Sequence, residues 1–190
     1  MSLKLDMSKA YDRMSLKLDM SKADDRVEWM FLDEMMKRIG FGKRWRRVVM
    51  DCISTPRFPF LINGTIQGKV IPQRDLRQGC PLSPYLFLIC AEGLSSLISQ
   101  SERDGQLMDF ACNRWGPRIS HLLFADDSLL FGRADKSEAE VKKNVLDVYS
   151  RQSGQDVNFN KTSIVFSSKV VAARREEIHV MLGERNRRPK

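Results

Sequence analysis

A chain of 190 residues, 42% of them hydrophobic, is long enough to bury a core and fits one domain. Its 32 lysines and arginines outnumber 24 acidic residues, and the net charge of +8 favours a polyanionic partner such as nucleic acid, although a soluble basic protein fits equally well. Scattered cysteines argue against a zinc site. Without a long apolar run or a signal peptide, we expect an intracellular protein of the nucleus or cytoplasm, not a secreted or membrane protein.

The chain begins with a sequence that occurs twice. Residues 1–13 read MSLKLDMSKAYDR and residues 14–26 read MSLKLDMSKADDR, so Tyr11 in the first copy corresponds to Asp24 in the second. A solenoid needs several stacked units of at least about 20 residues. The repeat therefore indicates a recent local duplication or an error in gene assembly.

Each copy predicts a short strand with an aspartate, Asp6 or Asp19, near its C-terminal end. Apolar residues at helical spacing then predict a helix over 27–39 that ends at Gly40. The residues expected on its apolar stripe are Val27, Met30, Phe31, Met35 and Ile39.

A second helix is predicted over 43–54, with Trp45, Val48, Val49 and Cys52 buried and Arg44, Arg46 and Arg47 facing out. Those arginines could bind phosphates, although a solvated helix face is the commoner reason for such residues. After this helix, Asn63-Gly64 lies between two β-prone runs and predicts a hairpin over 58–71, because this dipeptide accepts the positive φ angles of a type I′ turn.

A loop over 74–84 carries a glycine and two prolines and opens another helix, with Ser83 as N-cap and Pro84 at the first helical position. A helix N-terminus preceded by Gln78 and Gly79 can bind a phosphate through its free N–H groups. An ordinary capped helix explains the same residues.

The segment 121–131 reads HLLFADDSLLF, two short apolar runs around Asp126 and Asp127, and predicts a tight hairpin with acid at its tip. Two adjacent carboxylates in a partly desolvated site repel each other, and a divalent metal relieves that repulsion. A turn chosen for its turn propensity is the alternative.

Beyond the hairpin, a capping box of Ser137 and Glu140 predicts a further helix. Two short strands are expected at 156–159 and 163–166, on either side of Lys161. One more helix and a basic, frayed end complete the chain. The alternation of strands and helices indicates the α/β (α+β) class, with one sheet backed by helices.

Carboxylates from two separate strands can converge on a pair of metal ions about 3.5–4 Å apart, the arrangement used for in-line phosphoryl transfer. Mg²⁺ suits oxygen ligands and is commonly held by one or two carboxylates together with substrate phosphates.

Five stretches together resemble the reverse transcriptases of non-LTR (LINE-type) retrotransposons, especially those of plants. They are LKLDMSKAYDR with the following VEW, INGTIQG, LRQGCPLSPYLF, ISHLLFADDSLLF and SGQDVNFNKTSIVFS. The resemblance implies a right-hand polymerase palm, a small antiparallel sheet backed by helices. It also implies RNA-directed DNA polymerase activity with an RNA template, a DNA primer, dNTPs and two Mg²⁺ ions, for which Mn²⁺ can substitute.

Carried over by position, the resemblance assigns metal binding and catalysis to Asp19, or its duplicate Asp6, and to Asp126 and Asp127. Lys161 corresponds to a lysine near the triphosphate, where it could protonate the leaving pyrophosphate.

The resemblance also places Gln78 and Gly79 in the pocket for the incoming nucleotide, although Cys80 follows where the family usually has aspartate. An aromatic residue of the family lies under the deoxyribose; the first copy keeps it as Tyr11, whereas the second has Asp24.

By this resemblance residues 1–13 are a duplicated and extraneous copy, 14–168 a partial palm, and 169–190 a basic C-terminal helix and tail. We expect a retrotransposon fragment without fingers, thumb or endonuclease. The alternative is an inactive remnant that binds nucleic acid or a partner through its basic surface. Template preference and oligomeric state do not follow from the sequence.

Overall fold

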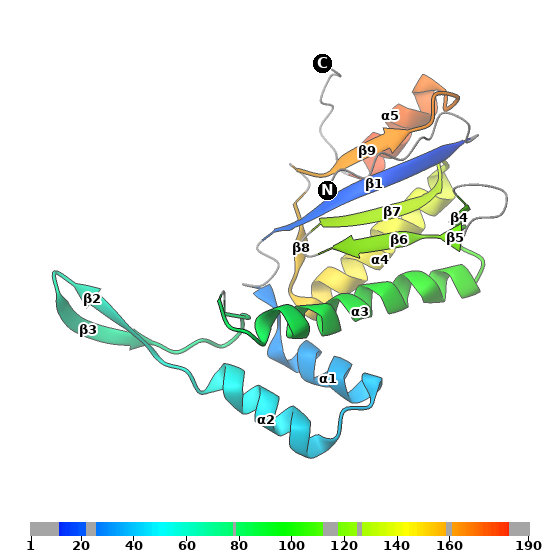
Figure 1. Cartoon of the computed structure of the whole chain (residues 1–190). Coiled ribbons are helices and arrows are strands. Elements are labelled where there is room, and N and C mark those ends of the chain that lie inside the picture. The colour runs from blue at the N-terminus through cyan, green and yellow to red at the C-terminus, as the bar shows by residue number, and fades with distance from the viewer. Residues whose placement is uncertain are drawn as a thin grey trace.

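The computed structural model describes residues 12–21, 26–77, 79–111, 118–124, 127–158 and 161–182, and every structural statement below refers to them. In chain order the elements are β1 (Arg13–Ser21), α1 (Trp29–Ile39), α2 (Lys43–Ser54), β2 (Phe58–Ile62), β3 (Thr65–Val70), α3 (Ser83–Arg103), β4 (Phe110–Ala111), β5 (Arg118–Ile119), β6 (His121–Phe124), β7 (Asp127–Arg133), α4 (Lys136–Ser153), β8 (Asp156–Val157), β9 (Ser163–Phe166) and α5 (Ala172–Met181). Figure 1 shows their arrangement.

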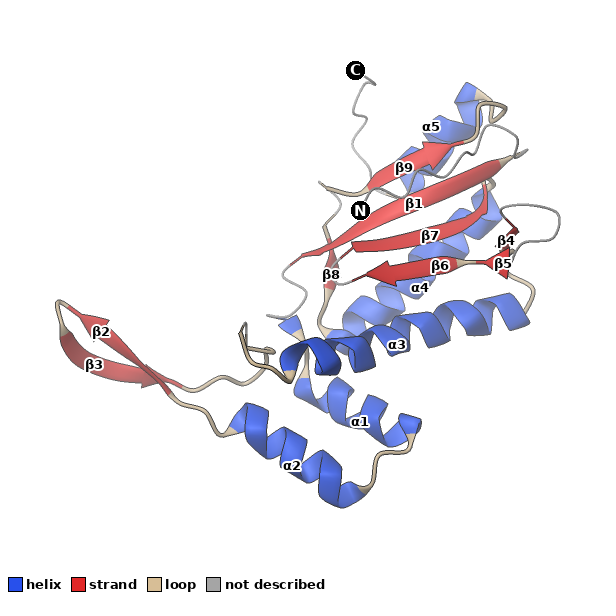
Figure 2. Ribbon diagram, viewed as in Figure 1, coloured by secondary structure: helices blue, strands red, loops and turns tan. Residues whose placement is uncertain are grey.

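Five strands form one antiparallel sheet with β1 at its centre (Figure 2). β7 pairs along one side of β1, and β6 continues the sheet beyond β7. On the other side of β1, β9 pairs with its first half and β8 with its end. The predicted fold class, a small antiparallel sheet backed by helices, is confirmed.

The two faces of β1 differ in burial because successive side chains of a strand point to opposite faces. Met14, Leu16 and Leu18 are each at most 1% exposed and join one core with residues of α3, α4 and α5. Lys17 and Asp19 lie on the other face. We call this other face, at the positions Lys17, Asp19, Asp127, Leu129 and Ser163, the open face.

α1 ends as predicted at Gly40, whose φ of 101° is left-handed and whose N–H donates to the carbonyls of Lys37 and Met36. Its predicted apolar stripe is partly wrong. Met30 is 88% exposed and Ile39 47% exposed, whereas Leu32 is buried. The buried side follows the contact with α3 rather than the most apolar line along the helix.

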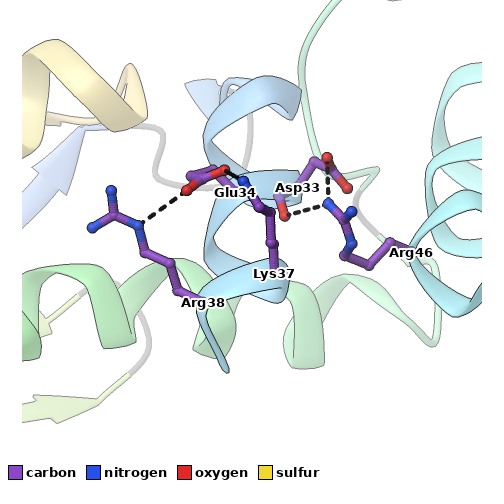
Figure 3. Close-up of polar contacts among 5 residues, drawn as sticks. All are labelled: Asp33, Glu34, Lys37, Arg38 and Arg46. Carbon is purple, nitrogen blue, oxygen red and sulfur yellow. Dashed lines mark hydrogen bonds and ion pairs between the residues drawn. The ribbon is translucent and has the colours of Figure 1, made fainter. Parts of the chain in front are cut away.

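α2 has the predicted bounds, but its predicted orientation is wrong. Only Val49 of its predicted core is buried, while Trp45 and Val48 remain about half exposed. Arg46 turns inward instead, and its guanidinium donates to the Asp33 carboxylate of α1 at 2.7 Å, as Figure 3 shows. Next to this contact on α1, Glu34 pairs with Lys37 and Arg38.

The hairpin of β2 and β3 is present as predicted, with positive φ at both Asn63 (52°) and Gly64 (78°). In Figure 1 it extends away from the central sheet. Its apolar side chains are correspondingly exposed, including Leu61 at 65% and Ile66 at 66%.

Both predicted N-caps are wrong by one or two positions. α3 begins at Ser83, which therefore lies inside the helix, and its hydroxyl donates to the Arg77 carbonyl at 2.7 Å. The cap of α4 is Asp135, whose carboxylate accepts the N–H of Glu138. Asp135 and Glu138 have the three-residue spacing of a capping box, as Ser137 and Glu140 also do, so the pattern alone allows either.

Candidate active site

The site is built where β1 ends and β7 begins. In the antiparallel register, Asp19 lies directly opposite Asp127. Directly opposed residues project from the same face, with Cβ atoms about 4.5–5.5 Å apart. The strand that carries Asp19 consists of the second copy of the repeat, preceded by Arg13, the last residue of the first copy. The sheet thus brings together two carboxylates that are far apart in the sequence.

Each of these carboxylates has a lysine beside it. Lys17 Nζ lies 3.0 Å from Asp127 Oδ2, and Lys161 Nζ lies 3.5 Å from Asp19 Oδ2. The Asp19 side chain is 19% exposed and that of Asp127 is 48% exposed. Adjacent carboxylates repel each other, and the two ammonium groups offset this repulsion.

Lys161 is positioned through the backbone of the same strand. The N–H of Asn158 donates to the Asp19 carbonyl at 2.8 Å, and the N–H of Lys161 then donates to the Asn158 carbonyl at 3.0 Å. The turn that carries the lysine is therefore anchored to the residue that carries the carboxylate.

Sequence reasoning missed Lys17. A signal was available, because Lys17 precedes Asp19 by two residues on a predicted strand, and residues two apart point to the same face. The contact of Lys17 with Asp127 depends on how β1 pairs with β7, and the sequence does not show this pairing.

Gly79 lies in the loop before α3, with a φ of 81° that favours glycine. In the same loop the N–H of Cys80 donates to the Arg77 carbonyl at 3.2 Å. A hydrogen bond from the Leu82 backbone lowers the pKa of the Cys80 thiol, against an opposing effect of burial. Gly79 belongs to a separate loop and is not part of the strand pair that holds Asp19 and Asp127.

Several predicted site residues lie outside the described residues: Asp6, Tyr11, Asp24, Gln78 and Asp126. Asp126 falls between β6, which ends at Phe124, and β7, which begins at Asp127.

The donor set fits a hard divalent cation. Asp19 and Asp127 offer carboxylate oxygens from opposed positions on one face, and Mg²⁺ is usually held by one or two carboxylates and by substrate phosphates. Each of the two carboxylates already attracts a cation, because the ammonium group of a lysine lies beside it.

The pattern of the family described as reverse transcriptase (RNA-dependent DNA polymerase) matches residues 1–183, nearly the whole chain. The chain belongs to this family. The resemblance to non-LTR retrotransposon reverse transcriptases, drawn above from five motifs, is confirmed by relatives that are themselves proteins of transposable elements.

The chain spans less than two thirds of the length of each of three curated relatives. An uncharacterized mitochondrial protein of Arabidopsis thaliana is 54% identical over 69 residues, 36% of this chain and 57% of that protein. The retrovirus-related Pol polyprotein from the type-1 retrotransposable element R2 of Popillia japonica is 26% identical over 137 residues, 71% of this chain and 21% of the polyprotein. The uncharacterized 149 kDa protein of transposon TX1 of Xenopus laevis is 26% identical over 161 residues, 85% of this chain and 11% of that protein.

A solved structure shares the fold. The apo telomerase of Candida tropicalis, truncated from its C-terminal domain, superposes with a TM-score of 0.59 at 17% identity, over 84% of this chain and 31% of that chain. Within the described part of the chain, no helix has the length and apolar character needed to cross a membrane.

Proposed function

We propose that this chain is the catalytic palm of an RNA-directed DNA polymerase, which transfers a nucleotide from a dNTP to the 3′-OH of a DNA primer on an RNA template. The observation that carries the proposal is the placement of Asp19 opposite Asp127 on the open face, with Lys161 beside Asp19. Family membership supplies the reaction class.

Asp19, Asp126 and Asp127 would hold two Mg²⁺ ions, which when bound supply Lewis-acid activation and neutralise charge on the transferred phosphoryl group. Phe124, opposite Asp127 on β6, is 83% exposed, so solvent and a primer end can reach this side of the carboxylates. Lys161, 67% exposed on its turn, can donate a proton to the leaving pyrophosphate.

Gln78 and Gly79 would line the pocket for the incoming nucleotide, and Asp24 would lie under its sugar. A carboxylate there offers no ring for stacking and brings negative charge towards the triphosphate. We therefore expect Asp24→Tyr to raise nucleotide incorporation by lowering the KM for dNTPs. An unchanged KM would place residue 24 outside the pocket, and a higher KM would refute the proposed stacking role of the aromatic ring.

Primer extension on a homopolymer RNA template with Mg²⁺ or Mn²⁺ tests the proposal. It is run with the full chain and with a longer relative in which residues 14–168 replace the corresponding palm. We expect Asp126→Ala to reduce incorporation by at least about a hundredfold, since removing charge stabilisation typically costs several kcal/mol of barrier.

Asp147→Ala is the matched control, because Asp147 is exposed on α4, away from the strand pair. It should leave incorporation unchanged. If Asp126→Ala retained normal incorporation, the hairpin carboxylates would have no part in catalysis. If the relative carrying this palm incorporated no nucleotide while its parent did, the palm would be a non-catalytic remnant.

A further inference from the structure

Lys17 has no role in the function proposed so far, yet it lies within the site. Its ammonium contacts Asp127 at 3.0 Å, and both side chains are about half exposed, 47% for the lysine and 48% for the aspartate. Lys17 also precedes Asp19 by two residues on β1, so the lysine and the Asp19 carboxylate share the open face.

We propose that Lys17 neutralises Asp127 while no metal is bound and moves to a nucleic-acid phosphate when a divalent cation takes its place. The inference rests on the proposed function and assigns a substrate contact to a residue of the same site.

An ammonium and a divalent cation compete for the Asp127 carboxylate, because both bind its oxygens and repel each other at short range. Lys17 is the group that can leave. Its ammonium sits on a flexible four-carbon stem, and the exposed pair is held only weakly in water.

The surroundings of Lys17 decide where the ammonium can go. Within the sheet its direct neighbours are Leu129 on β7 and Ser163 on β9, neither of which is charged. On this side of the paired strands the described acidic positions are Asp19, Asp127 and Asp156, the last of them opposite Ser21 at the end of β1 and paired with Arg26. Asp19 and Asp127 would be ligands of the metal. A displaced ammonium is therefore left facing solvent, where the anion that the polymerase brings is a nucleic-acid phosphate.

Metal affinity tests the first half of the exchange without any activity. Free Mn²⁺ is measured by electron paramagnetic resonance during titration of the full chain. We expect Lys17→Met to tighten Mn²⁺ binding about two- to fivefold, as expected for loss of a competing exposed ion pair. Lys17→Arg retains the competing cation and should bind Mn²⁺ like the unaltered chain.

Lys69→Met is the matched control, because it removes the same charge from the exposed hairpin strand β3. It should leave Mn²⁺ affinity unchanged. Equal tightening in both lysine variants would show a general effect of net charge and would overturn the inference.

Nucleic-acid binding tests the second half. With Mn²⁺ present, Lys17→Met should reduce the salt dependence of RNA–DNA duplex binding by about 0.7–0.9 in the slope of log K against log salt, the loss of one phosphate contact. With a chelator instead of metal, the slopes of variant and unaltered chain should agree. Identical slopes with Mn²⁺ would overturn the proposed phosphate contact.

The same titrations separate this inference from the proposed function. If Asp127→Asn weakens Mn²⁺ binding and Lys17→Met leaves it unchanged, the carboxylate site stands and the role of Lys17 is refuted. If neither the unaltered chain nor Lys17→Met binds Mn²⁺, the metal site of the proposed function fails together with the inference.

Discussion

Lys142 combines a positive charge with nearly complete burial. Its side chain is 2% exposed and lies 3.3 Å from the Glu138 carboxylate, itself 6% exposed. Glu138 also accepts the backbone N–H of Arg133 at 2.9 Å and that of Met108 at 3.3 Å. Burial lowers the pKa of the Lys142 ammonium, an effect that Glu138 opposes. This pair ties the end of β7 and the segment before β4 to α4.

We expect Lys142→Met to lower the free energy of unfolding by about 3–5 kcal/mol, because the variant leaves a buried carboxylate without its cation. Urea denaturation at pH 7 measures the loss. Adding Glu138→Gln to the variant should recover most of the stability, since the unpaired charge is then removed. A loss below about 1 kcal/mol in the single variant would mean that the backbone N–H donors of Arg133 and Met108 suffice to stabilise the Glu138 side chain.

His121 makes stability depend on pH. Its ring nitrogens contact the hydroxyls of Ser95 at 2.9 Å and Ser120 at 2.8 Å. Burial lowers the pKa of His121, partly offset by Glu102 and Glu92. Between the folded pKa and the unfolded value of about 6.5, the unfolded chain binds more protons, so stability is lost as the pH falls through this window.

We therefore expect the unaltered chain to lose more unfolding free energy between pH 7.5 and pH 5 than His121→Gln, whose amide does not titrate. Chemical denaturation at several pH values gives both curves. Parallel curves would show that the pKa of His121 is the same in the folded and unfolded states.

At the scale of single elements, two helices end in a left-handed glycine, and the two glycines differ in their surroundings. Gly40 follows α1 with φ 101°, and nothing lies within 4 Å of where a Cβ would be. Gly154 follows α4 with φ 78°, and a Cβ there would collide with the Arg26 carbonyl oxygen.

We expect Gly40→Ala to cost about 1 kcal/mol of stability, the strain of a left-handed alanine. Gly154→Ala should cost about 2–4 kcal/mol, because the helix end must also move away from the Arg26 backbone. Thermal or urea unfolding of the two variants compares them directly. Equal losses would show that the contact at Arg26 relaxes without cost.

Local signals predict those elements that are stabilised locally. Gly40 and Asn63-Gly64 have the positive φ angles expected of them, because these conformations depend on the residue itself and its immediate neighbours. The orientation of α2 could not be predicted in the same way. Its most apolar side contains Trp45, but in the structure Arg46 pairs with Asp33 and Val49 packs inward, contacts that depend on how α2 lies against α1.

At the scale of the whole molecule, the start of β1 is held by backbone hydrogen bonds from two other segments. Ala134 N–H donates to the Asp12 carbonyl at 2.8 Å, and Ser167 N–H donates to the Arg13 carbonyl at 3.0 Å. Removal of residues 1–11 should therefore leave the free energy of unfolding within about 0.5 kcal/mol. Urea denaturation of the shortened chain measures the difference, and a large loss would show that residues 1–11 stabilise the core.

The repeat provides a matched pair of further deletions. Removing residues 1–13 or removing residues 14–26 yields chains that differ only in having Asp24 or Tyr11 before the same continuation. In both chains no residues precede the remaining copy, so the strand lacks the two hydrogen bonds that Asp12 and Arg13 accept. Each chain should therefore lose about 1–2 kcal/mol of unfolding free energy, and the two losses should be equal. Unequal stability would show that the residue at this one position contributes to the fold.

The sequence by itself determined the family and most of the elements in their order, although it did not indicate the short strands β4 and β5. It also predicted the residue types of the site. Five motifs in the order of the family cover most of the chain. Each is a short run of residue types that can be recognised without knowing the fold. Asp19 and Lys161 were predicted as site residues in this way, and in the structure their side chains lie 3.5 Å apart.

Only the tertiary structure decided which residues face one another. The two copies of the repeat have identical strand sequences, so no local preference can distinguish Asp6 from Asp19. In the structure, pairing with β7 and β9 places the second copy in the centre of the sheet. The same register brings Lys17 to Asp127, because hydrogen bonding between strands far apart in sequence fixes which side chains share a face.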